Sequence, residues 1–139
     1  MRKISRLAIA LLMVVLLPLH AFAELIPPII SPHYNYTSVI SADLTISGGK
    51  AECAGTVKPD SGYYASVRVV LYRSSDGSSW TEIASWSDNP GSSGTSAIAS
   101  GSKSLSSGYK YKVTTFGTVK NSNGTTVESP TKSTSIKSY

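Results

Sequence analysis

The chain has 139 residues, with 13 Lys and Arg residues against eight Asp and Glu residues, and one cysteine. A single cysteine excludes an intramolecular disulfide. Residues 1–23 hold three of the basic residues and none of the acidic ones, so residues 24–139 carry a net charge of only +2. So small an excess, spread along the chain, predicts no nucleic-acid partner.

The first 23 residues have the three parts of a secretory signal peptide. A basic start precedes an unbroken apolar run of eleven residues over 7–17, and Ala21 and Ala23 supply the small-x-small cleavage pattern. This run is shorter than the roughly 20 apolar residues that cross a bilayer. We therefore predict cleavage after Ala23, secretion to the extracellular space and no membrane span after cleavage. An uncleaved membrane anchor is the alternative.

The rest of the chain divides into a short leader and one domain. Residues 24–38 contain three prolines, which disfavour both a helix and a central strand, so we expect an extended leader. Residues 39–139 are long enough to bury a core of their own. They are rich in Ser and Thr, which suit strands and turns better than helices.

Apolar and polar residues alternate with a period of two through this domain, as they do in half-buried strands. Gly48-Gly49 and Asn123-Gly124 are expected to form hairpin turns, and Pro130 marks the last strand as an edge. The predicted strands cover residues 39–46, 50–58, 63–73, 80–86, 96–105, 109–118 and 125–136. About seven strands separated by frequent turns predict an all-β, immunoglobulin-like antiparallel sandwich.

One segment also resembles a known family. Leu105, Tyr111 and Val113 have the spacing of the Leu-(x5)-Tyr-x-Val signature of fibronectin type III domains, in which the tyrosine forms a structural corner. This resemblance implies a fibronectin type III-like fold with structural roles for these three residues. The usual tryptophan of the second strand is missing, and small residues around Cys53 take its place. The whole chain also resembles uncharacterised small secreted proteins of Gram-positive bacteria, a resemblance that implies no activity.

No constellation of catalytic residues is recognisable, so we expect a protein that is not an enzyme and has no cofactor. His33 is the one histidine of residues 24–139, and no Gly-x-Ser-x-Gly elbow is present. The acidic residues are scattered, which predicts no metal site. The alternative is a calcium site formed by Asp76 and Asp88, if their loops share one end of the sandwich. Cys53 alternates with inward residues and is expected to be buried, although a lone cysteine can also link two chains.

Aromatic residues give the one candidate binding surface. Two neighbouring strands carry the candidate aromatic face, which consists of Tyr64, Arg68, Tyr72, Trp80 and Trp86. The alternation places Trp80, Ala84 and Trp86 on one side of their strand. If that side faces solvent, the rings form a platform for a sugar or a protein; if it faces inward, they fill the core.

These patterns predict a secreted, non-catalytic binding or interaction module at or near the cell surface. Its partner would be an extracellular protein or a glycan. The alternative is a small secreted effector, either bacteriocin-like or an inhibitor of an extracellular enzyme. The sequence leaves the identity of the ligand and the oligomeric state open.

Overall fold

The computed structural model describes residues 32–139, which form strands, turns and loops without a helix. The predicted signal peptide, its cleavage residues Ala21 and Ala23, and most of the leader lie outside the described residues. Within residues 32–139, no helix is long and apolar enough to cross a membrane.

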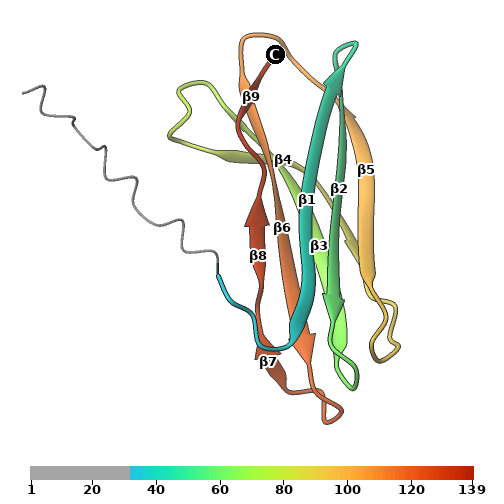
Figure 1. Ribbon diagram of the computed structural model, residues 1–139. Coiled ribbons are helices and arrows are strands. Elements are labelled where there is room, and N and C mark those ends of the chain that lie inside the picture. The colour runs from blue at the N-terminus through green and yellow to red at the C-terminus, as the bar shows by residue number, and fades with distance from the viewer. Residues whose placement is uncertain (1–31) are drawn as a thin grey trace, which may run out of the picture. The chain divides into compact units, whose positions relative to one another are not determined.

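The described residues form two antiparallel sheets (Figure 1). The first has the strand order β1-β2-β5, and the second has the order β4-β3-β6-β7, with β8 and β9 also paired to β6. The strands are β1 Thr37–Ser47, β2 Lys50–Pro59, β3 Tyr64–Ser74, β4 Thr81–Asp88, β5 Ala97–Ser104, β6 Lys110–Lys120, β7 Thr126–Glu128, β8 Thr131–Ser133 and β9 Lys137–Ser138.

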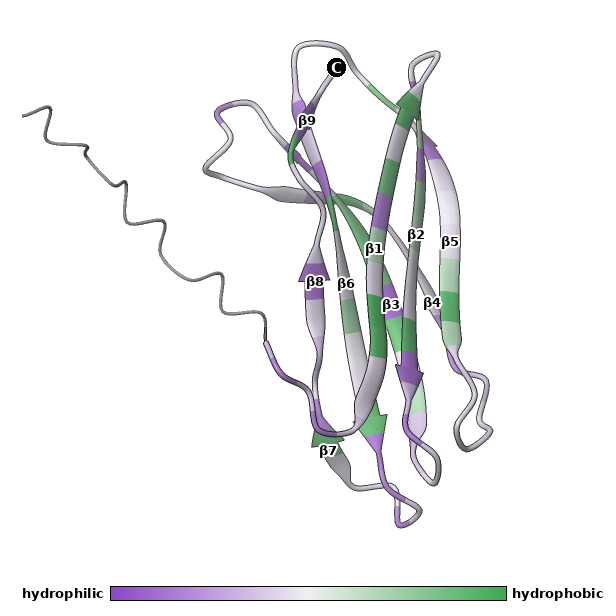
Figure 2. Cartoon of the chain, viewed as in Figure 1, coloured by the Kyte–Doolittle hydropathy of each residue, from purple (hydrophilic) through white to green (hydrophobic). Residues whose placement is uncertain are grey.

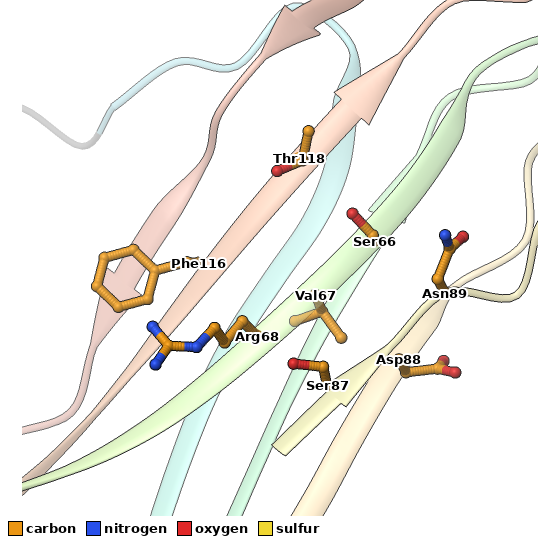
Figure 3. A pocket seen from close by; sticks show the side chains of 8 residues that line it. All are labelled: Ser66, Val67, Arg68, Ser87, Asp88, Asn89, Phe116 and Thr118. Carbon is orange, nitrogen blue, oxygen red and sulfur yellow. The ribbon is translucent and has the colours of Figure 1, made fainter. Parts of the chain in front are cut away.

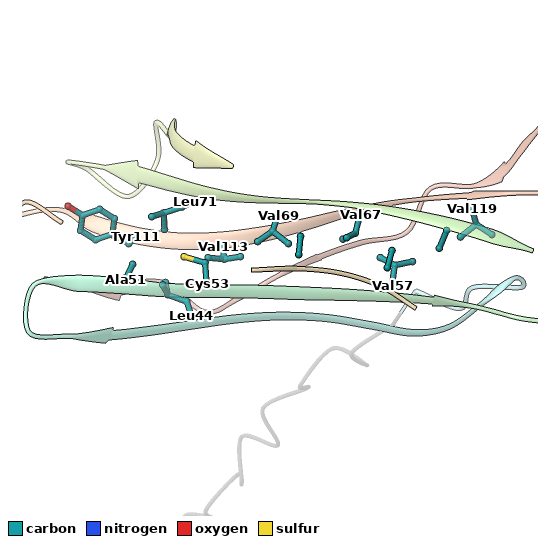
Figure 4. Packing of buried hydrophobic residues seen from close by; sticks show 13 residues of the cluster. Leu44, Ala51, Cys53, Val57, Val67, Val69, Leu71, Tyr111, Val113 and Val119 are labelled. Carbon is teal, nitrogen blue, oxygen red and sulfur yellow. The ribbon is translucent and has the colours of Figure 1, made fainter. Parts of the chain in front are cut away.

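The predicted all-β architecture is confirmed, and the hydrophobic core lies between the two sheets (Figure 4). Alternate residues of each strand point into it, as the period of two predicts. The alternation of hydropathy can be followed along β1 in Figure 2. The buried apolar residues are Leu44, Ala51, Cys53, Val57, Ala65, Val67, Val69, Leu71, Ala97, Ala99, Tyr111, Val113 and Val119.

Side chains of complementary size face each other across the core. The three-stranded sheet points small residues inward, such as Ala51, Gly55 and Ala99, and the other sheet points Leu71 and Tyr111 at them. A Cβ on Gly55 would lie 2.2 Å from Oγ1 of Thr115 on the opposite sheet. Glycine at this place therefore allows a closer approach of the two sheets than any other residue would.

The C-terminal segment differs from the prediction of one strand over residues 125–136. It consists of three short strands, β7, β8 and β9, and each of them pairs with β6. Pro130 lies between β7 and β8, where a residue without a backbone N–H ends the regular pairing. The backbone N–H of Gly117 donates to the carbonyl of Pro130 over 2.7 Å, so the break stays attached to β6.

The side chains of Glu128 and Tyr34 attach the leader residues nearest to the domain. The Glu128 carboxylate accepts hydrogen bonds from the backbone N–H of Asn35 (2.7 Å) and from the hydroxyl of Thr37. The hydroxyl of Tyr34 donates to the carbonyl of Thr131 over 3.1 Å. Regular strand structure consequently begins at Thr37, two residues before the predicted start.

Candidate functional site

The candidate site is the side of the β4-β3-β6 sheet that faces away from the core. On β3 and β6 this side consists of residues that alternate with the buried ones. The residues directly opposite each other are Tyr64 and Lys120, Ser66 and Thr118, Arg68 and Phe116, Val70 and Thr114, and Tyr72 and Lys112. These ten residues are called the outer face below.

Three of the five pairs join an aromatic ring to a cation. They are Tyr64 with Lys120, Arg68 with Phe116, and Tyr72 with Lys112, and they recur every four residues along β3. The two pairs between them carry hydroxyl groups and the buried Val70. Directly opposite residues on one sheet face have their Cβ atoms about 5 Å apart, so the ring and the cation of each pair start from neighbouring positions.

Trp80 extends the outer face at one end. The Nζ atom of Lys112 lies 4.3 Å from the centroid of the Trp80 ring and 5.9 Å from that of Tyr72. Both distances are within the range of a cation–π interaction. Of the predicted aromatic face, Tyr72 and Trp80 therefore come together around one lysine.

Trp86 points to the opposite side of the sheet from Tyr72 and Trp80. The pairing of β3 with β4 shifts between Leu71 and Tyr72, so that Ala84 opposes Leu71 and Glu82 opposes Tyr72. A bulge of this kind reverses the side to which later residues point. The expectation that Trp80 and Trp86 share a face is wrong for this reason, and Trp86 packs against the core.

A hollow of about 520 Å³ lies at the centre of the outer face (Figure 3). Its lining residues are Ser66, Val67, Arg68, Ser87, Asp88, Asn89, Phe116 and Thr118. The Phe116 side chain is 37% exposed, and Figure 3 shows its ring beside the Arg68 guanidinium. An exposed aromatic ring surrounded by hydroxyl, amide and guanidinium groups can stack on a ligand and hydrogen-bond to it.

Arg68 is held in place by Glu82 of β4. One guanidinium nitrogen donates to both carboxylate oxygens, at 2.6 and 2.8 Å. Both side chains are more than 40% exposed, so this ion pair contributes little to stability. It does orient the guanidinium over the outer face, and the remaining N–H donors of Arg68 are available to a ligand.

Tyr64 lies at the other end of the outer face, beside a second hollow of about 260 Å³. This hollow is lined by Tyr64, Asn89, Gly91, Lys120, Asn121, Ser122 and Gly124. A small depression of about 40 Å³ at Ser66 and Thr118 lies between the two, and Asn89 lines all three. The hollows therefore follow one another along β3 and β6.

The residues with expected structural roles lie away from the outer face. The Tyr111 hydroxyl donates to the carbonyl of Ser106 over 2.6 Å and accepts from the N–H of Ser106 over 3.1 Å. Val113 is fully buried, and Leu105 packs against the core. Cys53 is also buried, and desolvation, together with the charge of Glu52, raises the pKa of its thiol to about 11. A thiol with that pKa is protonated at neutral pH and is a poor nucleophile.

Asp76 and Asp88 lie at opposite ends of β4, because Asp76 follows β3 while Asp88 pairs with Val67 near the start of β3. The idea that their loops share one end of the sandwich is wrong. Oδ1 of Asp76 accepts hydrogen bonds from the N–H groups of Ser78 and Ser79, which lower the pKa of this carboxyl to about 2. Oδ2 of Asp88 accepts from the N–H of Ile98. Among residues 32–139, no three potential metal-ligating side chains come together.

Phe116, Lys112, Lys120 and Asn89 were not identified from the sequence as site residues. The alternation of β6 already places Lys112 and Phe116 on one side. However, β3 and β6 are not consecutive strands, so their pairing and register are not visible in the local pattern.

Comparison with known proteins identifies no family for this chain. No protein-family model matches the chain, and no curated protein matches its sequence.

Proposed function

We propose that this protein is an exported, non-catalytic binding module that binds saccharides through the outer face of the β4-β3-β6 sheet. The observation that carries the proposal is the hollow in which the exposed Phe116 ring lies beside Arg68, Ser66, Thr118 and Asn89. A sugar has an apolar ring face that stacks on an aromatic side chain. Its hydroxyl groups take the hydrogen bonds that the surrounding polar groups offer.

The fold part of the proposal is a fibronectin type III-like sandwich. Two features support it. The strands number seven if β7, β8 and β9, which all pair with β6, are taken together as one interrupted edge strand. In addition, the Tyr111 hydroxyl bonds to the backbone of Ser106, five residues upstream, as the tyrosine of such a corner does.

Export is proposed from the sequence of residues 1–23. If a secretory signal is removed after Ala23, the protein recovered from the medium of an expressing cell begins at Glu24. N-terminal sequencing measures this directly. A secreted form that begins elsewhere would correct the cleavage site, and a protein found only in the cell membrane would favour the uncleaved anchor.

The binding function is tested with a glycan array, followed by calorimetric titration of the best-binding saccharide. Phe116→Ala is expected to weaken binding about tenfold, which corresponds to about 1.4 kcal/mol. Ile98→Ala is the matched control, because Ile98 is 57% exposed and belongs to the other sheet. An array without any binding, or an equal effect of both substitutions, would overturn the proposal.

A further inference from the structure

We infer that the ligand is an acidic linear polysaccharide that lies lengthwise along β3 and β6. This inference rests on the proposed function and narrows it to one class of saccharide. The arrangement that carries it is the series of three ring–cation pairs on the outer face, Tyr64 with Lys120, Arg68 with Phe116, and Tyr72 with Lys112.

The spacing of these pairs describes an elongated site. Four residues of a strand span about 13 Å, so the three pairs extend over about 27 Å from Tyr64 to Tyr72. Hydroxyl groups of Ser66 and Thr118 fill the interval on the Tyr64 side, whereas Val70 and Thr114 in the other interval are buried. The successive hollows that share Asn89 run along the Tyr64 half of this line. A chain molecule fits such a line better than a compact ligand does.

The charges of this side of the sheet favour an anionic chain. Four cations face it, namely Lys110, Lys112 and Lys120 of β6 and Arg68 of β3, and Nζ of Lys110 lies beside Gly77 of the β3–β4 loop. The acidic groups on or beside this side are Glu82, which pairs with Arg68, Asp76 of the loop, whose Oδ1 accepts loop hydrogen bonds, and Asp88, which lines the central hollow and accepts from the N–H of Ile98. The net charge is therefore +1, and the cations are spread over the length of the site. Carboxylate groups repeated along a polymer would meet them in turn.

The spacing also argues against a nucleic acid as the ligand. Successive nucleotides of a strand repeat at about 3.4 Å in a helix, and single-strand binders stack neighbouring bases on neighbouring aromatic residues. Here the rings on β3 and β6 are separated by a pair of hydroxyl-bearing or buried residues. Sugar rings that touch protein only at intervals, with hydroxyl contacts between, match this pattern.

The test is a calorimetric titration of the purified protein with oligogalacturonides, from the dimer to the octamer. The fully methyl-esterified oligomers serve as neutral counterparts with the same sugar backbone. Binding of the acidic series is expected to strengthen with length and to exceed that of the neutral series at least tenfold for the octamer. Poly-L-glutamate and single-stranded DNA, which have charge without sugar rings of this kind, are expected to bind more weakly than the acidic octamer.

Lys120→Gln tests the lengthwise orientation, with Lys58→Gln as the control on the outer side of the other sheet. Lys120 and Lys58 are both exposed, so neither substitution should affect folding. Lys120→Gln is expected to weaken octamer binding several-fold, and more than it weakens dimer binding. Lys58→Gln should change neither.

The outcomes separate this inference from the proposed function. Equal binding of acidic and neutral octamers, or equal effects of Lys120→Gln and Lys58→Gln, would overturn the acidic ligand while leaving saccharide binding in place. Stronger binding of poly-L-glutamate or DNA than of the acidic octamer would also overturn it. If neither oligomer series binds and the glycan array is blank as well, the proposed function fails together with the inference.

Discussion

The indole of Trp86 on β4 lies directly against the backbone of Gly101 on β5, so that one aromatic ring closes the side of the core where the two sheets meet. A Cβ on Gly101 would lie 1.9 Å from Nε1 of the indole. Gly101 does not have a positive φ angle, so the requirement for glycine here comes from the ring rather than from the backbone.

Gly101→Ala should therefore destabilise the protein. The added methyl group has to displace the Trp86 ring from its place, and such overpacking costs about 1–3 kcal/mol. Urea unfolding followed by circular dichroism measures the change. Ser102→Ala, on the same strand but exposed, is the control and should stay within about 0.5 kcal/mol of the original protein. Equal stability of the two variants would contradict the contact.

Tyr111→Phe should lower the free energy of unfolding by about 1–3 kcal/mol. The N–H and the carbonyl of Ser106 would both lose the Tyr111 hydroxyl as their hydrogen-bond partner, while the ring stays buried. Tyr72→Phe, on the partly exposed outer face, is the matched control and should have little effect on the midpoint of urea unfolding. If Tyr111→Phe unfolds at the same urea concentration as Tyr72→Phe, the hydroxyl does not hold the corner.

The charge of Asp76 should stabilise the fold in a pH-dependent way. Its pKa is lowered from 3.8 to about 2 in the folded protein by the hydrogen bonds from Ser79, Ser78 and Ser74. A lowered pKa means that the stabilisation is fully present above about pH 4 and is lost as the pH falls through about 2. Asp76→Asn should be less stable than the original protein at neutral pH, and the difference should shrink over that interval. A difference that does not depend on pH would contradict the assignment.

Cys53 should resist thiol reagents in the folded protein. Burial in the core and the raised pKa of about 11 leave almost no thiolate at neutral pH. Labelling with a chromogenic disulfide reagent should be slow without denaturant and complete in concentrated urea. Rapid labelling of the folded protein, or a disulfide-linked dimer on a non-reducing gel, would mean that the thiol is accessible and that two chains can be joined through it.

The fold follows from a pattern that is present in the sequence, whereas the arrangement of the site does not. Alternation along residues 63–73 and 109–118 predicts strands and their inward residues, because a half-buried strand has to alternate. The bulge that separates Trp80 from Trp86 has no such local signal, and one extra residue is enough to change the side to which a ring points. Gly101 within a strand could have indicated a close contact of its backbone, as Gly55 could on β2.

The pairing of Arg68 with Phe116 is a second feature that the local sequence pattern does not predict. Each residue can be assigned to a strand and to a side of it, but the two strands are separated by β4 and β5 in the chain. Their register depends on contacts over the whole sandwich. For the same reason, the central hollow and the series of ring–cation pairs become visible only once the strand order is known.

NMR chemical-shift mapping of the ¹⁵N-labelled protein during titration with the galacturonate octamer tests most directly whether the outer face binds an acidic polysaccharide. Backbone shifts should change along Tyr64–Tyr72 and Lys112–Lys120, including the amides of Arg68 and Phe116, and stay constant along β1, β2 and β5. Changes centred on β1, β2 or β5 would place the binding surface on the other sheet and contradict binding at the outer face. Saturating octamer without any shift change along β3 and β6 would contradict it equally.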